Sequence, residues 1–450
     1  MKNLVLGVAK GYGWYDLESF VNSFTKNCSS AELVLFVDDI SDFTRDRLIR
    51  AGVSLKNFPY KIEGIPNNTR WKIFRDFTEA HGDEYEQIFI TDTRDVIFQS
   101  DVFEQFKGLS NWLGCVTEVD DIRGSKTGNS DNYRWIVNRS GKVEADKLIE
   151  VNYRWIADCF GKIEADKLAD EKTICCGTVI GSATEIKIFC REMWKILEHK
   201  TADIFDQATM NYLAYNGLLP IENLFEINVH DGAIFTYGVT LPGDSRDGLI
   251  LRGDGGIPAV VHQYDRHEEL LWLVNDIYLD KNFSFDKRFT DMRSLFEQCC
   301  GLLLINKIDE VAEIVSNAVF NKADLKNSVN NILKIWKFVC GRSFTRSSEI
   351  IELAVQNALY SVGVNELSLK QLEDVQKVLA HSTKYNHAVD NKLKFSFANL
   401  LFKFVKAALE KKSEYACFLY IDWLNQLELP PDKNFQRVVD EAKRIFGRDG

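Results

Sequence analysis

The stretch Ile88-Phe-Ile-Thr-Asp-Thr-Arg-Asp-Val-Ile-Phe98 decides how this chain is interpreted. It begins with three apolar residues, and so short a run predicts a buried β-strand rather than a helix. Asp92-Thr-Arg-Asp95 follows, and a second apolar run comes directly after it. Ligands of open α/β sheets bind outside the carboxyl ends of strands, so chemistry is expected here. Two interpretations stay open: carboxylates that hold a divalent cation, or a polar turn whose acids and arginine pair with each other.

The elements around this stretch alternate as they do in α/β proteins. Residues 4–9 and 31–38 are apolar runs of strand length. Residues 16–27 between them repeat apolar side chains with a helical period. A helix between two such strands is typical of a parallel sheet, so the fold class predicted for residues 1–284 is α/β.

The composition and the apolar periodicity of the sequence change from about residue 285. Glycine becomes scarce and apolar residues recur at every third and fourth position, which predicts a separate all-helical domain over residues 285–450. Within it, residues 392–412 combine six lysines with an apolar face. Such a helix can lie on an anionic membrane, or it can be a core helix with a solvated lysine face. Partner docking and oligomerisation are further uses of this domain.

Composition and charge narrow the function classes. The chain has 450 residues and a formal net charge of −11, which argues against broad nucleic-acid binding. Its ten cysteines form no C-x-x-C pair and are expected to be reduced cytosolic thiols. No secretory leader and no run of 18 apolar residues stands in the sequence. The expected location is the cytoplasm, at most peripherally on the inner face of the membrane.

Two early segments are candidates for binding a nucleotide. Residues 10–15 follow the first strand, and Gly11 permits close backbone approach while Tyr12 and Tyr15 can stack on a base. A plain turn is the alternative. Arg70 opens a predicted helix, where it can hold a phosphate or lie on the surface.

Three later features suggest a site on the same sheet. Gly177 interrupts a predicted strand over residues 173–181, which indicates a bulge or a ligand close to the backbone. Asp206 and Gln207 stand near the start of a predicted helix, where the helix dipole orders polar groups. Asp206 can equally be a simple N-cap of that helix.

Two histidines end the sheet region. His262 directly follows an apolar strand, and Asp265, Arg266 and His267 stand in the next turn. A histidine in such a place is often structural. The combination of two histidines, an acid and an arginine makes a functional cluster the competing interpretation.

An internal repeat with a period of 20 lies between these motifs. Residues 132–148 and 152–168 match at most positions, and we interpret them as a local tandem duplication that forms a helical excursion beside the site. Two copies are too few for a solenoid. Its aromatic residues can pack the insert or stack on an acceptor sugar; they are Tyr133, Trp135, Tyr153 and Trp155.

The order of these motifs resembles that of nucleotide-sugar glycosyltransferases of the A-type (GT-A) fold, most closely the glycogenin-like and related bacterial polysaccharide transferases. The resemblance covers residues 1–280 and implies a Rossmann-type mixed sheet. It says nothing of the helical domain. The matching stretches are Thr91-Asp-Thr-Arg-Asp-Val96, Cys176-Gly-Thr-Val-Ile-Gly181, Asp206-Gln-Ala-Thr-Met-Asn211 and Val261-His-Gln-Tyr-Asp-Arg-His267.

The resemblance implies a metal site for Mn²⁺ or Mg²⁺. Asp95 matches the second acid of the D-x-D motif, and His262 would be a further ligand. Such a cation stabilises the leaving diphosphate as a Lewis acid. The sequence departs from the pattern at Thr93, where the first acid is expected. Either Asp92 substitutes for that acid, or Arg94 partly replaces the metal.

The resemblance also implies roles for the remaining motifs. Asp206 and Gln207 would lie beside the reactive carbon of the sugar as catalytic residues. The residues expected to bind the nucleotide sugar are Gly11, Tyr12, Tyr15, Asp38, Arg70, Asp92, Arg94, Gly177 and His267.

The function expected from the resemblance is transfer of a hexose from a UDP-sugar, with UDP-galactose or UDP-glucose as the donor. The acceptor would be a glycan such as an O-antigen or capsule chain on a lipid carrier. Two alternatives stay open. One is a nucleotide-sugar hydrolase or nucleotidyltransferase, and the other is a catalytically inactive scaffold.

Overall fold

The computed structural model divides the chain into two compact units, Met1–Asp280 and Lys281–Gly450, and each is described by itself. The described part of the second unit includes the helices α11 (Met292–Leu304) and α18 (Lys433–Phe446). Of the basic stretch 392–412 the structure describes Leu401 and Val405, both buried. The residues described are 1–59, 66–123, 151–199, 205–228, 232–237, 244–288, 291–305, 307, 310–311, 314, 401, 405, 418–423 and 433–446.

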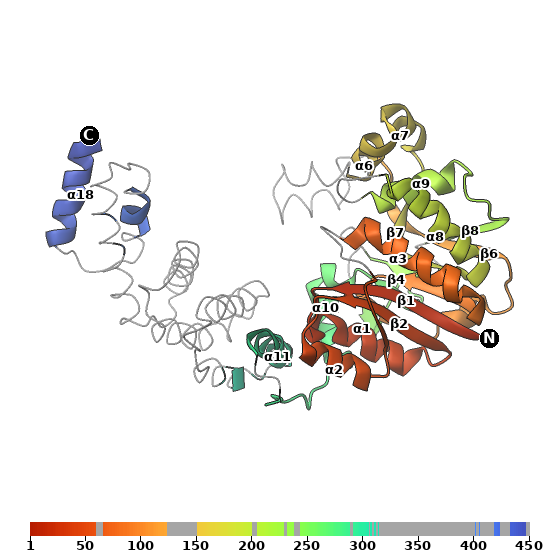
Figure 1. Ribbon diagram of the computed structural model, residues 1–450, viewed down its shortest axis with the longest axis horizontal. Helices are drawn as coiled ribbons and strands as arrows, with labels where there is room; N and C mark the ends of the chain where they lie inside the picture. The colour runs from red at the N-terminus through yellow and green to blue at the C-terminus, as the bar shows by residue number, and fades with distance from the viewer. Residues whose placement is uncertain are drawn as a thin grey trace. The chain divides into compact units, whose positions relative to one another are not determined.

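The first unit is built on a seven-stranded mixed sheet (Figure 1). The strands lie in the order β3-β2-β1-β4-β7-β6-β8. The first four are parallel, whereas β7 runs antiparallel to both β4 and β6. The predicted α/β class with a Rossmann-type mixed sheet is therefore confirmed. The strands are β1 (Lys2–Lys10), β2 (Ala31–Asp38), β3 (Ser54–Asn57), β4 (Tyr85–Thr91), β6 (Trp112–Asp121), β7 (Lys172–Ser182) and β8 (Asn223–Ile227).

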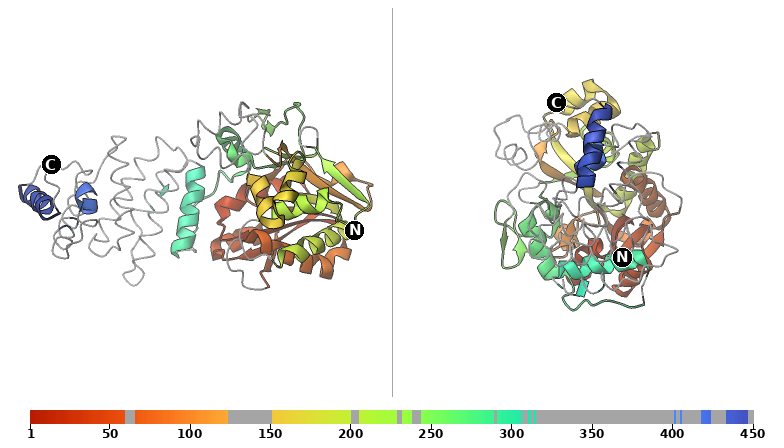
Figure 2. Two further views of the ribbon diagram at one scale, coloured as in Figure 1. Left: turned by 90° about the horizontal axis from the view of Figure 1, so that it is seen from above. Right: turned by 90° about the vertical axis from the view of Figure 1, so that its left-hand side faces the viewer.

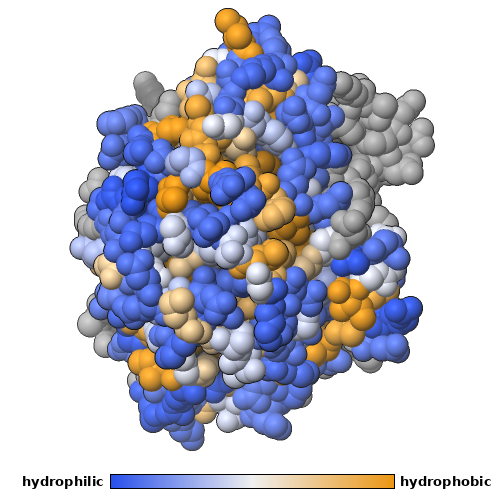
Figure 3. Space-filling model, turned by 90° about the vertical axis from the view of Figure 1, so that its right-hand side faces the viewer, coloured by the Kyte–Doolittle hydropathy of each residue, from blue (hydrophilic) through white to orange (hydrophobic). Residues whose placement is uncertain are grey.

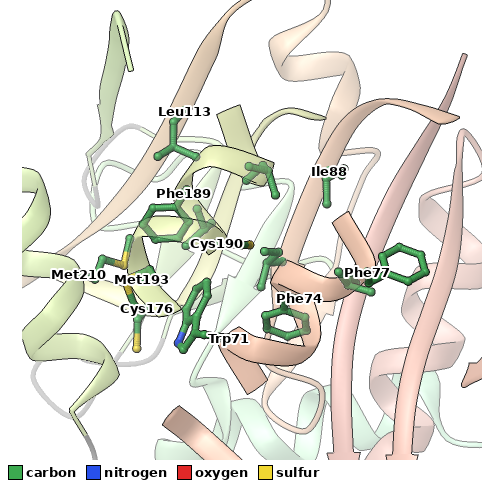
Figure 4. Close-up of a cluster of buried hydrophobic side chains, with 14 of the residues drawn as sticks. Trp71, Phe74, Phe77, Ile88, Leu113, Cys176, Phe189, Cys190, Met193 and Met210 are labelled. Atoms are coloured by element: carbon green, nitrogen blue, oxygen red, sulfur yellow. The ribbon is translucent and has the colours of Figure 1, made fainter. Parts of the chain in front are cut away.

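Helices cover both faces of this sheet. The apolar side chains of α3 and α8 meet those of the sheet in one buried cluster, in which Trp71 packs edge-on against both Phe74 and Phe189 (Figure 4). This packing fixes the start of α3 and thereby the position of Arg70. The helices are α3 (Pro66–His81), α8 (Ala183–Leu197) and α9 (Asp206–Tyr215) on this face, with α1 (Trp14–Asn27), α2 (Asp42–Arg50) and α10 (Glu268–Tyr278) on the other.

A small second sheet joins segments that are distant in the sequence. Its strands are β5 (Val96–Phe98), β12 (Val260–His262) and β9 (Ile234–Thr236). β12 pairs antiparallel with β5 and parallel with β9. Because His262 is registered against Val96, the strand pairing brings His262 next to Asp95.

The second copy of the repeat forms the helices α6 (Val151–Phe160) and α7 (Lys162–Leu168) between β6 and β7. Both views place them beside α9 (Figures 1 and 2). The Phe160 ring stacks on Tyr212 of α9 with 3.9 Å between the ring centroids. The predicted helical excursion is confirmed for this copy, whereas the first copy lies outside the described residues.

The sheet ends at β8, whose residues are exposed up to Ile227. Leu218, Leu224 and Phe225 are among the exposed large apolar side chains. Figure 3 views the first unit from the side on which β8 lies and shows apolar side chains gathered within a hydrophilic surface. In the described part of the chain, no helix has the length and apolar character needed to cross a bilayer.

Candidate functional site

The four polar residues of the turn after β4, Asp92 to Asp95, point toward different partners. Thr93 is buried, and its Oγ1 donates a hydrogen bond to the Val8 carbonyl at 2.9 Å. Asp92 and Asp95 instead face His262. Thr93 therefore ties the turn to β1, and the two carboxylates that converge are those of Asp92 and Asp95.

Backbone hydrogen bonds hold this turn and its neighbours in register. The Asp92 N–H donates to the Gly177 carbonyl at 2.8 Å, and the Gln263 N–H donates to the Asp95 carbonyl at 2.7 Å. Gln263 adopts a left-handed conformation with φ +59° directly after His262. Such a conformation is unfavourable for a residue with a side chain, and it tends to occur where function demands it.

Asp92, Asp95 and His262 form a group suited to a divalent cation. The His262 Nε2 lies 3.6 Å from Asp92 Oδ2 and 3.9 Å from Asp95 Oδ1. His262 is 1% exposed, and its Nε2 is buried without a hydrogen-bond partner. The other ring nitrogen, Nδ1, lies 3.3 Å from Thr236 Oγ1 and 3.6 Å from Cys175 Sγ. A buried nitrogen without a partner beside two carboxylates fits a bound cation, with Nδ1 oriented by its own contacts.

Gly177 keeps the space in front of this group open. A Cβ atom at this position would lie 2.6 Å from His262 Cε1 and 2.7 Å from Asp92 Oδ2. The pairing of β6 with β7 is irregular here, because Cys115 pairs with Val179 but Thr117 pairs with Ile174. The predicted bulge is therefore present. Any residue with a Cβ atom at position 177 would clash with His262 and Asp92, so the bulge requires glycine there.

Arg70 lies on the opposite side of Asp92. Its Nη1 is paired with Asp92 Oδ1, and its Nη2 donates to Asp206 Oδ2 at 2.7 Å and to the Cys176 carbonyl at 3.3 Å. Burial alone would raise the pKa of Asp92, but Arg70 and His262 together outweigh burial and hold that pKa well below its usual range. Asp95 differs, since burial raises the pKa of its carboxyl. Arg70 therefore acts as a fixed cation between the buried carboxylate of Asp206 and the half-buried carboxylate of Asp92.

The N-terminus of α9 carries two residues with different surroundings. Asp206 is 1% exposed and stands inside the first turn, whereas the N-cap is Phe205, so the N-cap interpretation of Asp206 is wrong. Its Oδ2 also accepts from Trp71 Nε1 at 3.4 Å. The Gln207 Nε2 donates to Asn152 Oδ1 of α6 at 2.9 Å. The Gln207 amide oxygen accepts the long contact of the Cys176 thiol at 3.9 Å and lies at the cavity as an acceptor.

The third residue of the Asp-Gln-x-x-x-Asn motif has a structural role. The Asn211 Oδ1 accepts from the Ile174 N–H at 2.8 Å, and its Nδ2 donates to the Ile174 carbonyl at 3.0 Å. These bonds pair the backbone of β7 just before its irregular segment. Asn211 therefore holds the bulge in place rather than facing a ligand.

These groups surround one cavity of about 340 Å³, within the range of small-molecule sites. Nine predicted site residues contribute to it. Arg266, Lys10, Asn67 and Gln263 also line it, although the motif pattern does not single them out as ligand-binding. The cavity is lined by Val8, Lys10, Tyr12, Asn67, Arg70, Asp92, Thr93, Arg94, Asp95, Trp155, Cys175, Cys176, Gly177, Asp206, Gln207, His262, Gln263 and Arg266.

Two arginines stand near the carboxylates. The Arg94 guanidinium is 4.0 Å from Asp95 Oδ2 and that of Arg266 is 3.7 Å away, with side chains 42% and 40% exposed. Arg94 also pairs with Asp265 at 3.4 Å. Because both guanidinium groups keep access to solvent, they can meet a ligand phosphate. In the sequence, Arg266 is indicated only by its place in the cluster with His262, Asp265 and His267.

Four of the predicted site residues, all of which the structure describes, do not line this cavity. Gly11 has φ +73° and donates its N–H to the Asp38 carbonyl at 3.0 Å. The Asp38 carboxylate pairs with Lys10 at 3.4 Å. Tyr15 lies in the first turn of α1, and His267 is buried against the Tyr237 ring with 5.3 Å between centroids.

Comparisons with known proteins find only distant similarity. No family model matches the sequence, and no curated protein matches it. The structure is similar to the galactosyltransferase LgtC in complex with donor and acceptor sugar analogs, at 14% identity over 63% of this chain and 98% of that chain, with a TM-score of 0.34. It is similar to the glycosyltransferase GlyE of Streptococcus pneumoniae TIGR4, at 14% identity over 68% and 62%, with a TM-score of 0.31. A third is the glucosyl-3-phosphoglycerate synthase of Mycobacterium tuberculosis with Mn²⁺ and UDP, at 12% identity over 50% and 69%, with a TM-score of 0.29.

Proposed function

We propose that the first unit is a metal-dependent glycosyltransferase that moves a hexose from a UDP-sugar to a glycan acceptor. The observation that carries this proposal is the group of Asp92, Asp95 and His262, in which the buried Nε2 of His262 lies 3.6 Å and 3.9 Å from the two carboxylates. It stands outside the carboxyl end of β4, where ligands of α/β sheets bind.

Asp92, Asp95 and His262 would hold Mn²⁺ or Mg²⁺. When bound, such an ion offers Lewis-acid stabilisation to a leaving diphosphate. Of the two alternatives, the geometry favours Asp92 as the substitute for the acid missing at Thr93 over Arg94 as a partial replacement for the metal, because Asp92 faces His262 while Arg94 faces Asp265.

The other residues of the cavity suit the remaining parts of a nucleotide sugar. Arg94 and Arg266 offer half-exposed guanidinium groups for the diphosphate. Tyr12 offers an aromatic ring for the base at the end of β1. Asp206 accepts bonds from Arg70 and Trp71, so we assign it to orienting the α9 terminus rather than to removing a proton. The Gln207 oxygen is then the group nearest to the reacting sugar.

The donor and acceptor follow from the motif resemblance alone. UDP-galactose and UDP-glucose are the first donors to test, and a lipid-linked O-antigen or capsule chain is the acceptor we propose. The second unit would bring the enzyme to that acceptor by partner docking, self-association or contact with the membrane surface.

The proposal is tested by UDP release from a panel of UDP-sugars with Mn²⁺, with Mg²⁺ and with EDTA. We expect release from one sugar, loss with EDTA, and a fall of roughly 10²–10³-fold in Asp95→Asn. Asp83→Asn is the matched control, since that carboxylate is 91% exposed. Neither binding nor turnover of any UDP-sugar would contradict the proposal and favour the scaffold. Release at a rate that no acceptor changes would favour the hydrolase.

A further inference from the structure

The second copy of the tandem repeat reaches into the cavity. Asn152 and Trp155 stand three residues apart on α6, so their side chains share one helix face. Asn152 accepts the hydrogen bond from Gln207, and Trp155 lines the cavity. The face of α6 that carries both residues is therefore a wall of the site.

The other two aromatic residues of α6, Tyr153 and Phe160, make contacts elsewhere, and Phe160 stacks on Tyr212 of α9. The Tyr153 hydroxyl donates to Asp166 of α7 at 2.7 Å, and its ring lies under the Arg123 guanidinium at 5.4 Å. Tyr153 thus stabilises the α6–α7 pair itself. Trp155 packs partly against the apolar cluster beneath α6 and still faces the cavity. An indole ring held on one side and open on the other makes a rigid apolar platform.

Topology separates Trp155 from the residues that we assign to the nucleotide. Tyr12 follows β1 and lies within electrostatic range of Arg94, Asp92 and Asp95. α6 leaves the sheet between β6 and β7, which lie on the other side of β4 from β1. The two aromatic residues therefore approach the turn after β4 from opposite sides, and Trp155 is free to meet a second ligand.

We propose that α6 forms the acceptor subsite and that the indole of Trp155 stacks on the apolar face of a hexopyranose ring. This rests on the proposed function, because a donor must occupy the Asp92, Asp95 and His262 side. A sugar ring presents C–H groups on one face and hydroxyls on its edge, which the Trp155 ring and the Gln207 oxygen complement. The duplication would thus have supplied a specificity element to the transferase.

The test measures two affinities of the full chain in the presence of Mn²⁺: that for UDP by calorimetry, and that for methyl hexopyranosides by ligand-observed NMR with UDP bound. The variants are Trp155→Leu, which keeps apolar packing but has no flat ring, and Trp155→Phe, which keeps a ring. Trp272→Ala on α10 is the control, since Trp272 is exposed and does not line the cavity.

We expect Trp155→Leu to weaken binding of the methyl glycoside about 10-fold or more, Trp155→Phe to retain most of it, and UDP affinity to stay unchanged in both. Equal glycoside affinity in Trp155→Leu and wild type would overturn the inference. So would a wild type that binds UDP but no glycoside, or a loss of UDP affinity in Trp155→Leu. A wild type that binds no UDP would overturn the proposed function as well.

Discussion

The two oxygens of Asp92 face two halves of the site, which differ in the positive partner that each offers to its carboxylates. In the arginine half, Oδ1 meets Arg70, which also pairs with Asp206. In the cation half, Oδ2 faces Asp95 and His262, and among the residues that the structure describes no guanidinium comes nearer to Asp95 than the 3.7 Å of Arg266. Buried carboxylates require a positive partner. The arginine half contains its own cation, and the cation half is built to receive one.

The largest expected effect comes from removing the ligand nitrogen of the cation half. His262→Gln replaces the buried Nε2 by an amide, and we expect UDP release to fall roughly 10²–10³-fold because charge on the leaving diphosphate is no longer stabilised. UDP release with saturating Mn²⁺ measures it. His81→Gln is the control, since that histidine is exposed. Equal rates in His262→Gln and wild type would contradict a role for the cation half in catalysis.

Removing the cation of the arginine half should affect stability. Arg70→Met leaves Asp92 and the buried Asp206 without their partner, and breaking such a pair costs about 3–5 kcal/mol. Urea unfolding followed by tryptophan fluorescence gives the change in the free energy of unfolding. Arg75→Met is the control, because its ion pair with Asp76 is half-exposed and such pairs contribute about 1 kcal/mol or less. Similar losses in the two variants would contradict the distinction between the halves.

The space in the cation half can be filled without substituting any of the three proposed metal-ligand residues. Gly177→Ala places a Cβ against His262 and Asp92, so we expect Mn²⁺ affinity to fall about 10-fold or more while the arginine half keeps its pairs. Gly253→Ala is the matched control, since no atom lies within 4 Å of a Cβ there. Calorimetric titration with Mn²⁺ measures both. An unchanged affinity in Gly177→Ala would show that this space is not used by the cation.

The smallest effect concerns a buried carboxyl outside the site. Glu18 of α1 accepts a hydrogen bond from the Asp280 N–H, yet burial raises its pKa from 4.5 to about 6. Since the pKa is raised in the folded state, the stability that Glu18 contributes is present below pH 4.5 and is lost as the pH rises through 6. A shift of this size corresponds to about 2 kcal/mol.

Glu18→Gln should therefore stabilise the protein by about 1–2 kcal/mol at pH 8 and by little at pH 4.5, which urea unfolding at both values measures. Glu86→Gln is the control, because Glu86 is exposed on β4. A gain that does not depend on pH would mean that burial is not what perturbs Glu18.

Much of the first unit could be predicted because its elements are periodic. The apolar runs over residues 4–9, 31–38 and 88–90 and the helical period over residues 16–27 each correspond to an element of the structure. The position of Asp92 and Asp95 after a buried strand marks them as site candidates, and the order of the motifs, by its resemblance to that of A-type glycosyltransferases, adds His262 as a further ligand.

The remaining features depend on contacts between distant segments, which local patterns do not encode. Arg70 looks like a phosphate ligand in the sequence, but the packing of Trp71 turns it toward Asp206. His267 follows His262 closely, yet the short turn after β12 directs it to Tyr237. Trp155 enters the cavity only because α6 packs against α9. No periodicity predicts where an inserted helix pair docks.

The most direct test of the central claim, that Asp92, Asp95 and His262 hold a divalent cation, is Mn²⁺ binding measured by electron paramagnetic resonance. The full chain is treated with EDTA, dialysed and titrated with Mn²⁺ in the presence and absence of UDP. We predict one site per chain in wild type and in His81→Gln, and an affinity at least about 10-fold weaker in His262→Gln. Equal binding in all three proteins, or none in wild type even with UDP, would contradict the account.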